Sequence, residues 1–430
     1  MKTNNTNRFI KEEILNKATL FNGNNMDSLK SLSDNSVDSV VTDPPYGLSF
    51  MGKKWDHDVP SVEFWKEVYR VLKPGGHVLS FGGTRTYHRM VVNIEDAGFE
   101  IRDQIMWIYG QGFPKSHDIG KAVDKIQGNE RKVTGSKGSQ ITGGGQLNGK
   151  NTRKEVFVTE GSSEFEGWGT ALKPANEPIC VARKPISEKS VALNAIKYGT
   201  GGLNIDGSKV GTDKVSTHTN GNGHLGKNGI YNDFKPQTGS ELREGRFPSN
   251  VIMDQAMGEE LGDQRKFFYC PKVSNPERNL GLDFMESQRI EGRDAGQDSR
   301  NVPFKIGTNE RKNIHPTVKP VDLMRYLIKL VTPKNGVILD PFMGSGSTGV
   351  GALIEGFQFI GMEMDNGYFE IAKQRIQHFE KFKEMLDKKK MAKTPSKSKK
   401  QPKKKVETTV QSDKIPLYGI WANRGLRRIA

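Results

Sequence analysis

The chain has 430 residues and a formal net charge of +15, so it is long enough for two or three domains with a substantial core. It contains no run of eighteen or more apolar residues, and its first residues lack the apolar core of a secretion signal, so we expect a cytoplasmic protein with no membrane contact. Its two cysteines, Cys180 and Cys270, lack the spacing of metal ligands, which predicts reduced thiols and neither a bound metal nor a disulfide.

The first 110 residues alternate between strand and helix patterns. Val37–Thr42 is a continuous apolar or β-branched run with the length of a buried strand. Ser61 caps an amphipathic pattern that reaches Leu72 and is stopped by the Lys-Pro-Gly-Gly sequence after it, which predicts a helix. Further elements are expected over residues 77–81 (strand), 86–97 (helix) and 99–109 (apolar run). This order is typical of a parallel sheet covered by helices on both faces.

Asp43-Pro44-Pro45-Tyr46 directly follows the predicted strand that ends at Thr42. It combines a carboxylate, a backbone carbonyl held by two prolines, and an aromatic ring. In isolation, this sequence is equally compatible with a rigid proline turn whose aspartate caps a helix. Its position after a buried strand, in a chain that also carries a glycine-rich turn at 340–346, favours a catalytic site.

Polar segments interrupt the alternation in the middle of the chain. Gly, Ser, Lys and Asn dominate residues 110–150 and again 199–229, where we expect long loops. Between them, the apolar residues within 178–184 predict one further strand. Since long loops in a compact domain usually have a task, we interpret the central part as an insert that grips a partner; tolerated disordered insertions are the alternative.

The strand and helix patterns return near the C-terminus. Residues 336–340 predict a strand, and the turn Asp340-Pro341-Phe342-Met343-Gly344-Ser345-Gly346 leads into a helix over 347–355. That helix contains Gly349 and Gly351, which indicate close approach of backbone or ligand, because glycine costs about 1 kcal/mol in a helix interior. A strand over 357–362 and a long amphipathic helix towards Leu386 follow.

The second of these strands ends at Glu363, which is 23 residues after Asp340. A strand, a glycine turn, a helix and a second strand ending in an acid resemble the cofactor half of a Rossmann-like fold. In that arrangement the acid accepts hydrogen bonds from ribose hydroxyls while the ligand lies against backbone amides. The pattern therefore predicts a ligand that carries a nucleoside, although a glycine turn alone also occurs as a simple connector.

Much of the positive charge is concentrated beyond this region. Ten lysines and no acidic residue lie between Lys388 and Lys405, which accounts for two-thirds of the net charge. Without aromatic residues, this segment cannot bury enough surface to fold, so we expect a disordered Lys-rich tail. The tail could bind polyanions without sequence preference or serve as a solubilising linker.

Together the two motifs resemble the DNA amino-methyltransferases. Asp43-Pro44-Pro45-Tyr46 is similar to their catalytic motif, and the turn from Asp340 to Gly346 is similar to their S-adenosylmethionine-binding motif. Residues 72–76 and 315–320 agree with the same family, and the resemblance covers roughly 18–110, 170–185 and 310–380. The catalytic motif comes first, as in the circularly permuted beta group. The resemblance implies S-adenosyl-L-methionine as cofactor, double-stranded DNA as partner, and an α/β Rossmann-like methyltransferase sheet with helices on both faces and loop-rich inserts.

The same resemblance assigns the site residues. The cofactor-binding residues that it implies are Asp340, Phe342, Gly344, Gly346, Glu363, Thr317 and Lys319. Family members commonly carry a Gly-Asp pair before the catalytic strand, and this chain has Gly23-Asn24 instead. Asn24 is therefore expected to offer its side-chain carbonyl to the adenine of the cofactor, and Asp27 is the alternative.

The catalytic residues implied are Asp43, Pro44, Pro45 and Tyr46. The lone pair of an exocyclic amine is delocalised into the base, so the nitrogen is a poor nucleophile until its hydrogens point at acceptors. The Asp43 carboxylate and the Pro44 carbonyl would be those acceptors, and they would stabilise the positive charge that grows on the nitrogen. Tyr46 would offer a face on which a flipped base stacks.

On this interpretation the chain has six parts, and its function is site-specific methylation of DNA, with adenine N6 favoured. The parts are the catalytic half (1–110), a loop-rich insert (111–170), a returning core strand (171–185), a target-recognition insert (186–310), the cofactor half (311–386) and the Lys-rich tail (387–430).

Cytosine-N4 methylation and a catalytically inactive DNA-binding protein on a methylase scaffold are the alternatives to this function. A methylase of protein glutamine or ribosomal RNA is disfavoured by the motif order. A companion restriction endonuclease and a homodimer both remain open.

Overall fold

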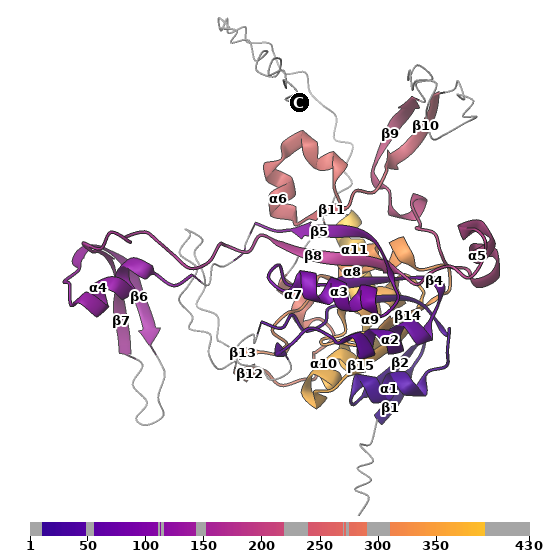
Figure 1. The fold of residues 1–430 in the computed structure, drawn as a ribbon, viewed down its shortest axis with the longest axis horizontal. Helices are drawn as coiled ribbons and strands as arrows, with labels where there is room; N and C mark the ends of the chain where they lie inside the picture. Colours follow the sequence, from indigo (N-terminus) through magenta and orange to yellow (C-terminus); the bar gives the residue numbers. More distant parts are fainter. Residues whose placement is uncertain are drawn as a thin grey trace, which may run out of the picture. The chain divides into compact units, whose positions relative to one another are not determined.

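The computed structural model describes residues 11–48, 56–110, 112, 116–142, 152–218, 240–269, 271, 275–289 and 310–391. Within them, nine strands form one mixed sheet in the order β1-β2-β15-β14-β3-β4-β8-β5-β11 (Figure 1). The strands are β1 Lys11–Leu15, β2 Ala18–Asn22, β3 Val37–Thr42, β4 Leu72–Phe81, β5 Glu100–Ile108, β8 Asn176–Arg183, β11 Val251–Met253, β14 Val337–Asp340 and β15 Gln358–Glu363.

Helices cover both faces of this sheet, as the sequence predicts. One face packs against α1 (Asn25–Ser31), α2 (Val62–Val71) and α3 (Tyr87–Asp96), which bury Leu29, Trp65 and Met90. The other face packs against α8 (Val321–Val331), α9 (Ser347–Ile354) and α10 (Asn366–Gln377), which bury side chains such as Leu327 and Phe369. Successive strand residues point to opposite faces, so both apolar layers share the same strands.

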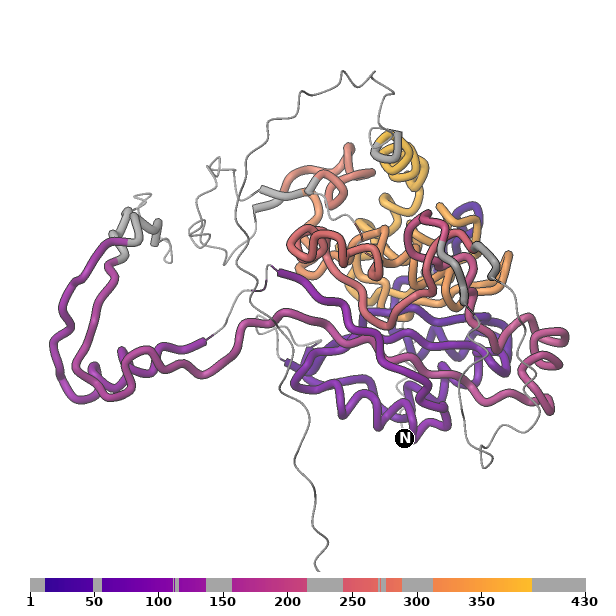
Figure 2. Tube along the Cα trace, turned by 90° about the horizontal axis from the view of Figure 1, so that it is seen from above, coloured from indigo at the N-terminus to yellow at the C-terminus, as the bar shows by residue number. Residues whose placement is uncertain are grey.

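The early and late parts of the chain interleave in the sheet. Strand β15 pairs in parallel with β2 and with β14, and β14 pairs in parallel with β3. The indigo N-terminal segment and the orange to yellow segments after residue 310 consequently lie side by side in the core (Figure 2). This pairing joins the two regions that carry the sequence motifs.

The expectation of a parallel sheet is wrong for two of its strands, β8 and β1. Strand β8 is antiparallel to both of its neighbours, β4 and β5. The chain leaves the sheet at the carboxyl end of β5 and returns at the same edge, with Ile108 opposite Asn176. A strand that starts at this edge must run back through the sheet. The first residues of β8 therefore lie at the edge where the parallel strands end. Strand β1 is also antiparallel to its neighbour, β2.

The expectation of long loops over 110–150 and 199–229 is wrong where the described residues of those ranges form a helix or strands. Asp118 caps helix α4 (Ile119–Gln127), which ends at the left-handed Gly128, and β6 (Lys132–Thr142) pairs with β7 (Thr152–Glu160). Strand β9 (Val210–His218) pairs with β10 (Ser240–Arg246). The strand pairs are two-stranded and separate from the main sheet. Their sequences are mainly polar and carry no regular alternation of apolar residues, so their pairing could not be recognised from composition.

The remaining elements are shorter. They are α5 (Val191–Tyr198), η3 (Asp206–Ser208), α6 (Gln255–Glu260), η4 (Gly262–Phe267), α7 (Asn275–Asn279), β12 (Gln288–Arg289), β13 (Glu310–Arg311) and α11 (Phe379–Met391). The single long helix expected after Glu363 is divided at His378, which ends α10 and precedes α11. Strand β4 begins at Leu72, five residues before the predicted start.

Several expectations concern residues outside this description. Cys180 is a buried free thiol, whereas Cys270 and the Lys-rich tail beyond Met391 lie outside the described residues. In the described part of the chain, no helix is long and apolar enough to cross a membrane. Nor does that part contain a group of three or more His, Cys, Asp or Glu side chains placed to hold a metal ion.

The two glycines of α9 allow close contact between protein elements. A Cβ atom on Gly349 would lie 2.6 Å from atoms of Phe359 and Ile376, and one on Gly351 would lie 3.3 Å from Arg325. The close approach predicted from these glycines is therefore an approach of neighbouring protein side chains. It lets α9 lie directly on β15 and next to α8.

We expect Gly349→Ala to destabilise the fold. The helix would gain about 1 kcal/mol from the better helix former, but overpacking against a buried ring would cost more, so the free energy of unfolding should fall by about 1–2 kcal/mol. Urea denaturation followed by circular dichroism measures the difference. Gly202→Ala, where a Cβ meets nothing within 4 Å, is the matched control. Equal stability of the two variants would contradict this packing argument.

Candidate active site

The two sequence motifs meet at the carboxyl ends of β3 and β14. In this parallel pair, Ser39 is opposite Ile338 and Val40 is opposite Leu339. Just beyond, the Thr42 hydroxyl donates a hydrogen bond of 2.7 Å to the Asp340 carboxylate. The last residue before the Asp-Pro-Pro-Tyr motif is thus bonded to the first residue of the glycine turn. Two segments almost three hundred residues apart begin side by side.

Asp43 belongs to a group of four side chains that we call the Asp43 cluster: Asp43, Tyr46, Glu177 and Lys319. The Lys319 ammonium lies 2.6 Å from Oδ2 of Asp43 and 3.1 Å from Oε2 of Glu177. The Tyr46 hydroxyl lies 2.7 Å from Oδ1 of Asp43 and 2.9 Å from the same Glu177 oxygen. Two carboxylates therefore share one cation and one hydroxyl.

Burial controls the ionisation of this cluster. It raises the pKa of Asp43, the Glu177 charge raises it further, and Lys319 opposes both effects. Burial and the two carboxylates hold the pKa of Tyr46 well above its ordinary value, so the phenol is neutral. Burial disfavours the ammonium of Lys319, but Asp43 and Glu177 more than compensate and raise its pKa. At neutral pH Lys319 is a cation.

The backbone after Asp43 is held by a buried carboxylate. Asp56 is 2% exposed and accepts hydrogen bonds from the amides of Tyr46, Gly47 and Leu48 at 2.7, 2.9 and 3.2 Å. On the other side, the Thr86 hydroxyl donates to the Tyr46 carbonyl at 2.5 Å. These contacts fix the backbone of the turn, and the hydrogen bonds of the Tyr46 hydroxyl to Asp43 and Glu177 fix the ring.

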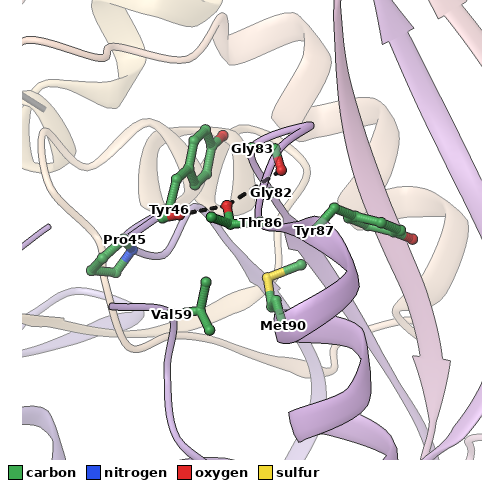
Figure 3. Close-up of a pocket in the computed structure, with 8 residues that line it drawn as sticks. All are labelled: Pro45, Tyr46, Val59, Gly82, Gly83, Thr86, Tyr87 and Met90. Carbon is green, nitrogen blue, oxygen red and sulfur yellow. Dashed lines mark hydrogen bonds between the residues drawn. The ribbon is translucent and has the colours of Figure 1, made fainter. Parts of the chain in front are cut away.

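A small pocket lies behind this turn (Figure 3). It is lined by Pro45, Tyr46, Val59, Gly82, Gly83, Thr86, Tyr87 and Met90. Apart from the Thr86 hydroxyl, which is bonded to the Tyr46 carbonyl, its walls are mainly apolar. The pocket thus surrounds Pro45 and Tyr46 with mainly apolar side chains.

Asp340 joins the two halves of the site. One of its oxygens accepts from Thr42 and from the Phe342 amide, and the other accepts from the Thr348 hydroxyl at 2.6 Å. The carboxyl is 2% exposed, and burial raises its pKa to about 6. Its hydrogen bonds thus connect β3, the glycine turn and α9. We predicted a cofactor-binding role for Asp340, and its observed contacts are with protein groups.

The glycine turn and Glu363 face each other at the end of β15. The Gly344 amide donates to one oxygen of Glu363 at 3.0 Å, and the Asp365 amide donates to the other at 2.8 Å. Burial raises the pKa of Glu363 to about 7. Gly344 and Gly346 have φ values of 50° and 76°, the left-handed region that favours glycine. Phe342 packs its ring against Phe64, with ring centroids 5.0 Å apart.

The segment before α8 contacts both motifs. A Cβ on Gly344 would lie 2.7 Å from the ring of His315, so this ring packs directly on the glycine turn. Burial, with Lys319 nearby, lowers the pKa of His315 to about 3, and the imidazole is neutral. Thr317 is exposed. Lys319 contacts Asp43 and Glu177, because the chain crosses from one motif to the other between His315 and Lys319. Binding of the cofactor stays a prediction for Thr317 and Lys319.

Asn24 has a local structural partner. It caps α1, and its side-chain oxygen accepts from the Met26 amide at 2.8 Å. The preceding amide, of Gly23, donates to the Glu363 carbonyl at 3.0 Å, so this turn lies beside the acidic end of β15. Contact with a bound adenine stays a prediction for Asn24, and its oxygen would then have to accept a second hydrogen bond.

Sequence reasoning did not identify Glu177 and Asp56. Glu177 directly precedes the apolar run that predicted β8, but an acid at the start of a strand lies near the site only if that strand is antiparallel. Asp56 follows a segment outside the described residues and is recognised only by its three amide contacts. Neither residue belongs to a motif with fixed spacing.

Comparison with known proteins identifies the family. A profile described as DNA methylase, of the N6/N4 type, matches residues 37–374. The Type II methyltransferase M.HindIII of Haemophilus influenzae is 24% identical over 83% of this chain and 94% of its own length. The Type II methyltransferase M.SfiI of Streptomyces fimbriatus is 22% identical over 81% and 88%, respectively.

Among solved structures, the PvuII DNA methyltransferase (cytosine-N4-specific) superimposes with a TM-score of 0.43 at 14% identity, covering 84% of this chain and 86% of its own. The profile spans most of the chain and includes both motifs that meet at β3 and β14. The chain therefore belongs to the N6/N4 DNA methylase family and is an S-adenosylmethionine-dependent DNA methyltransferase.

Proposed function

We propose that this chain methylates the N6 amine of an adenine that is flipped out of double-stranded DNA. The observation that carries the proposal is the bond between Thr42 and Asp340, which brings the Asp43 carboxylate and the glycine turn to one edge of the sheet. Aspartate rather than serine before Pro-Pro-Tyr favours adenine over cytosine in families that resemble this one. Cytosine N4 is the alternative target base.

The groups around Glu363 suit a ligand that carries a nucleoside. Each Glu363 oxygen accepts one backbone amide, from Gly344 or from Asp365, and a carboxylate oxygen can accept a second bond. Ribose hydroxyls would supply those donors. The Phe342 side chain lies in the same turn and offers apolar surface to an adenine ring. S-adenosylmethionine, when bound, supplies a methyl group on a positively charged sulfur.

Asp43 prepares the attacking nitrogen. When the amine donates a hydrogen bond to this carboxylate and another to the Pro44 carbonyl, its lone pair is freed from conjugation with the base. The nitrogen then forms the new bond to carbon while the sulfur keeps the electron pair of the bond that breaks. The nitrogen loses one proton, and Asp43 is the base placed to accept it. Tyr46 supports the base by its ring; Asp56 and Thr86 hold its backbone, and its hydroxyl is bonded to Asp43 and Glu177.

We assign the reading of the DNA sequence to the segments between the core strands. In the described parts of 111–170 and 186–310, α4 with β6 and β7, and the pair of β9 and β10, stand apart from the main sheet. Loops and small modules of this kind position side chains against DNA while a rigid scaffold holds the chemistry. Methylation of a defined sequence would also suit a partnership with a restriction endonuclease.

The modified base tests the proposed function directly. Expression in a bacterial host without DNA methyltransferases, followed by mass spectrometry of the nucleosides, should yield N6-methyladenine. Sequencing of the same DNA identifies the methylated site. N4-methylcytosine in its place would establish the alternative target. No modified base, together with normal cofactor binding by the purified chain, would support an inactive scaffold that binds DNA.

Asp43→Ala should reduce methyl transfer by about 100-fold or more, because the amine loses its charged acceptor. The affinity for S-adenosylmethionine, measured by calorimetry, should stay nearly unchanged. Asp96→Ala, at the exposed end of α3, serves as the control and should retain full activity. Equal loss of cofactor affinity and of methyl transfer in Asp43→Ala would contradict the role assigned to this residue.

Glu363 should make cofactor affinity depend on pH. The ionised carboxylate accepts ribose hydroxyls more strongly, and its pKa is raised to about 7 by burial, so affinity should fall as the pH is lowered from 8 to 6. Glu363→Gln should bind about 10-fold more weakly at pH 8, with little change down to pH 6. Calorimetric titrations at both pH values measure this. If Glu363→Gln keeps the wild-type pH dependence, a group other than Glu363 causes the change in cofactor affinity.

A further inference from the structure

The Asp43 cluster contains more charge than activation of an amine requires. One acceptor carboxylate is sufficient for that purpose, yet Glu177 adds a second and Lys319 adds a cation. The three side chains are only 16%, 22% and 8% exposed for Asp43, Glu177 and Lys319, respectively. In such a dry environment each charge strongly affects the others, and an unpaired one is costly.

Lys319 has two opposing effects on Asp43. Its positive charge favours the ionised carboxylate, which the reaction needs. At the same time its ammonium donates to Oδ2 of Asp43 at 2.6 Å, where it competes with an incoming amine for the acceptor. A cation held there would also disfavour positive charge on the reacting nitrogen. For methyl transfer, Lys319 must keep Asp43 ionised and yet leave its oxygen free for the amine.

Glu177 gives the Lys319 ammonium a second carboxylate to bind. Its Oε2 lies 3.1 Å from the same ammonium, so Lys319 already contacts a second carboxylate and can leave Asp43 without becoming unpaired. The antiparallel direction of β8 places Glu177 at this edge. The ammonium also lies 5.0 Å from the centroid of the Phe81 ring and 5.6 Å from that of Tyr46, and both rings can accommodate a cation.

We propose that Lys319 and Glu177 act as a positioning pair for methyl transfer: Lys319 keeps Asp43 ionised and occupies the place of the substrate amine, and Glu177 takes over the ammonium when the amine binds. This inference rests on the proposed function, in which Asp43 accepts the amine. It assigns a role to Glu177 and moves Lys319 from the cofactor to the reacting base.

Three other titratable groups face the cluster: Tyr109, His315 and Asp340. Tyr109, after β5, is neutral because burial raises its pKa to about 12. His315 is neutral because burial lowers its pKa to about 3. Asp340, which is close enough to Asp43 to interact with it, is bonded to Thr42 and Thr348. Because burial raises the pKa of Asp340 to about 6 and Asp43 interacts with it, the rate profile is read together with a direct titration of Asp43.

The test compares how kcat/KM for unmethylated DNA varies between pH 6 and pH 9. In Lys319→Met, loss of the cation beside a buried carboxylate disfavours ionised Asp43, so the fall in rate at low pH should move to higher pH. At pH 6.5 we expect a rate about 10-fold or more below wild type, with partial recovery at pH 9. Lys319→Arg retains the cation and should keep the wild-type position of this fall.

Glu177→Gln should change the profile in the opposite direction. Loss of the like charge favours ionised Asp43, so the fall in rate moves to lower pH. The rate at pH 9 should nevertheless be lower than in wild type, because Lys319 has no second carboxylate and stays on Asp43. Adding Lys319→Met to this variant removes the competing ammonium and should raise the rate at pH 9 again. A merely structural role predicts neither the opposite shifts nor this rescue.

A second readout does not depend on turnover. The carboxyl carbon of Asp43, in protein labelled with ¹³C-aspartate and assigned with Asp43→Asn, reports its ionisation by NMR. Its titration should move up in Lys319→Met and down in Glu177→Gln. Thermal unfolding verifies that each variant is folded, and Lys373→Met, which removes an ion pair with Glu13 away from the site, is the charge control.

The outcomes separate this inference from the function on which it rests. Shifts in the same direction, or no shift in the titration of Asp43, overturn the positioning pair even if Asp43→Ala is inactive. Full activity of Asp43→Ala would instead remove the proposed role of Asp43 in the reaction. Opposite shifts of the Asp43 titration in Lys319→Met and Glu177→Gln, with recovery of the rate at pH 9 in the double variant, support both the positioning pair and the role of Asp43.

Discussion

The hydrogen bond from Thr42 to Asp340 and the parallel pairing of β3 with β14 connect the two halves of this enzyme. Asp340 accepts from both halves and from the Thr348 hydroxyl of α9, and it is almost fully buried. A buried acceptor that loses its donor costs about 1–3 kcal/mol, so these three side chains are strongly interdependent. Each motif starts at the end of one of the two paired strands. The contacts among Thr42, Asp340 and Thr348 therefore set the distance between Asp43 and the glycine turn.

The sequence was sufficient for the elements that carry both motifs. The apolar run at Val37–Thr42 and the glycine turn before α9 have strong local patterns, and their strands were predicted within one or two residues. Burial on both faces also followed from the continuous apolar runs. These features depend on residues that are neighbours in the chain.

Features that depend on distant residues could not be predicted in this way. The direction of β8 is set by where the insert before it re-enters the sheet, and the residues of β8 themselves do not indicate that direction. Glu177 therefore looked like an ordinary polar residue before a strand. The contact of Lys319 with Asp43 could not be predicted either, because its neighbours in sequence pack on the glycine turn while its own ammonium reaches Asp43.

The insert between β5 and β8 leaves and re-enters the sheet at adjoining positions, with Ile108 opposite Asn176. Both attachment points are held by backbone hydrogen bonds of the central sheet, one residue away from Glu177. The intervening segment can consequently change in length and content during evolution while the carboxylate beside the catalytic motif stays where it is. Under the proposed role of the inserts in reading DNA, exchange of this segment would change the recognised sequence without renewed optimisation of the chemistry.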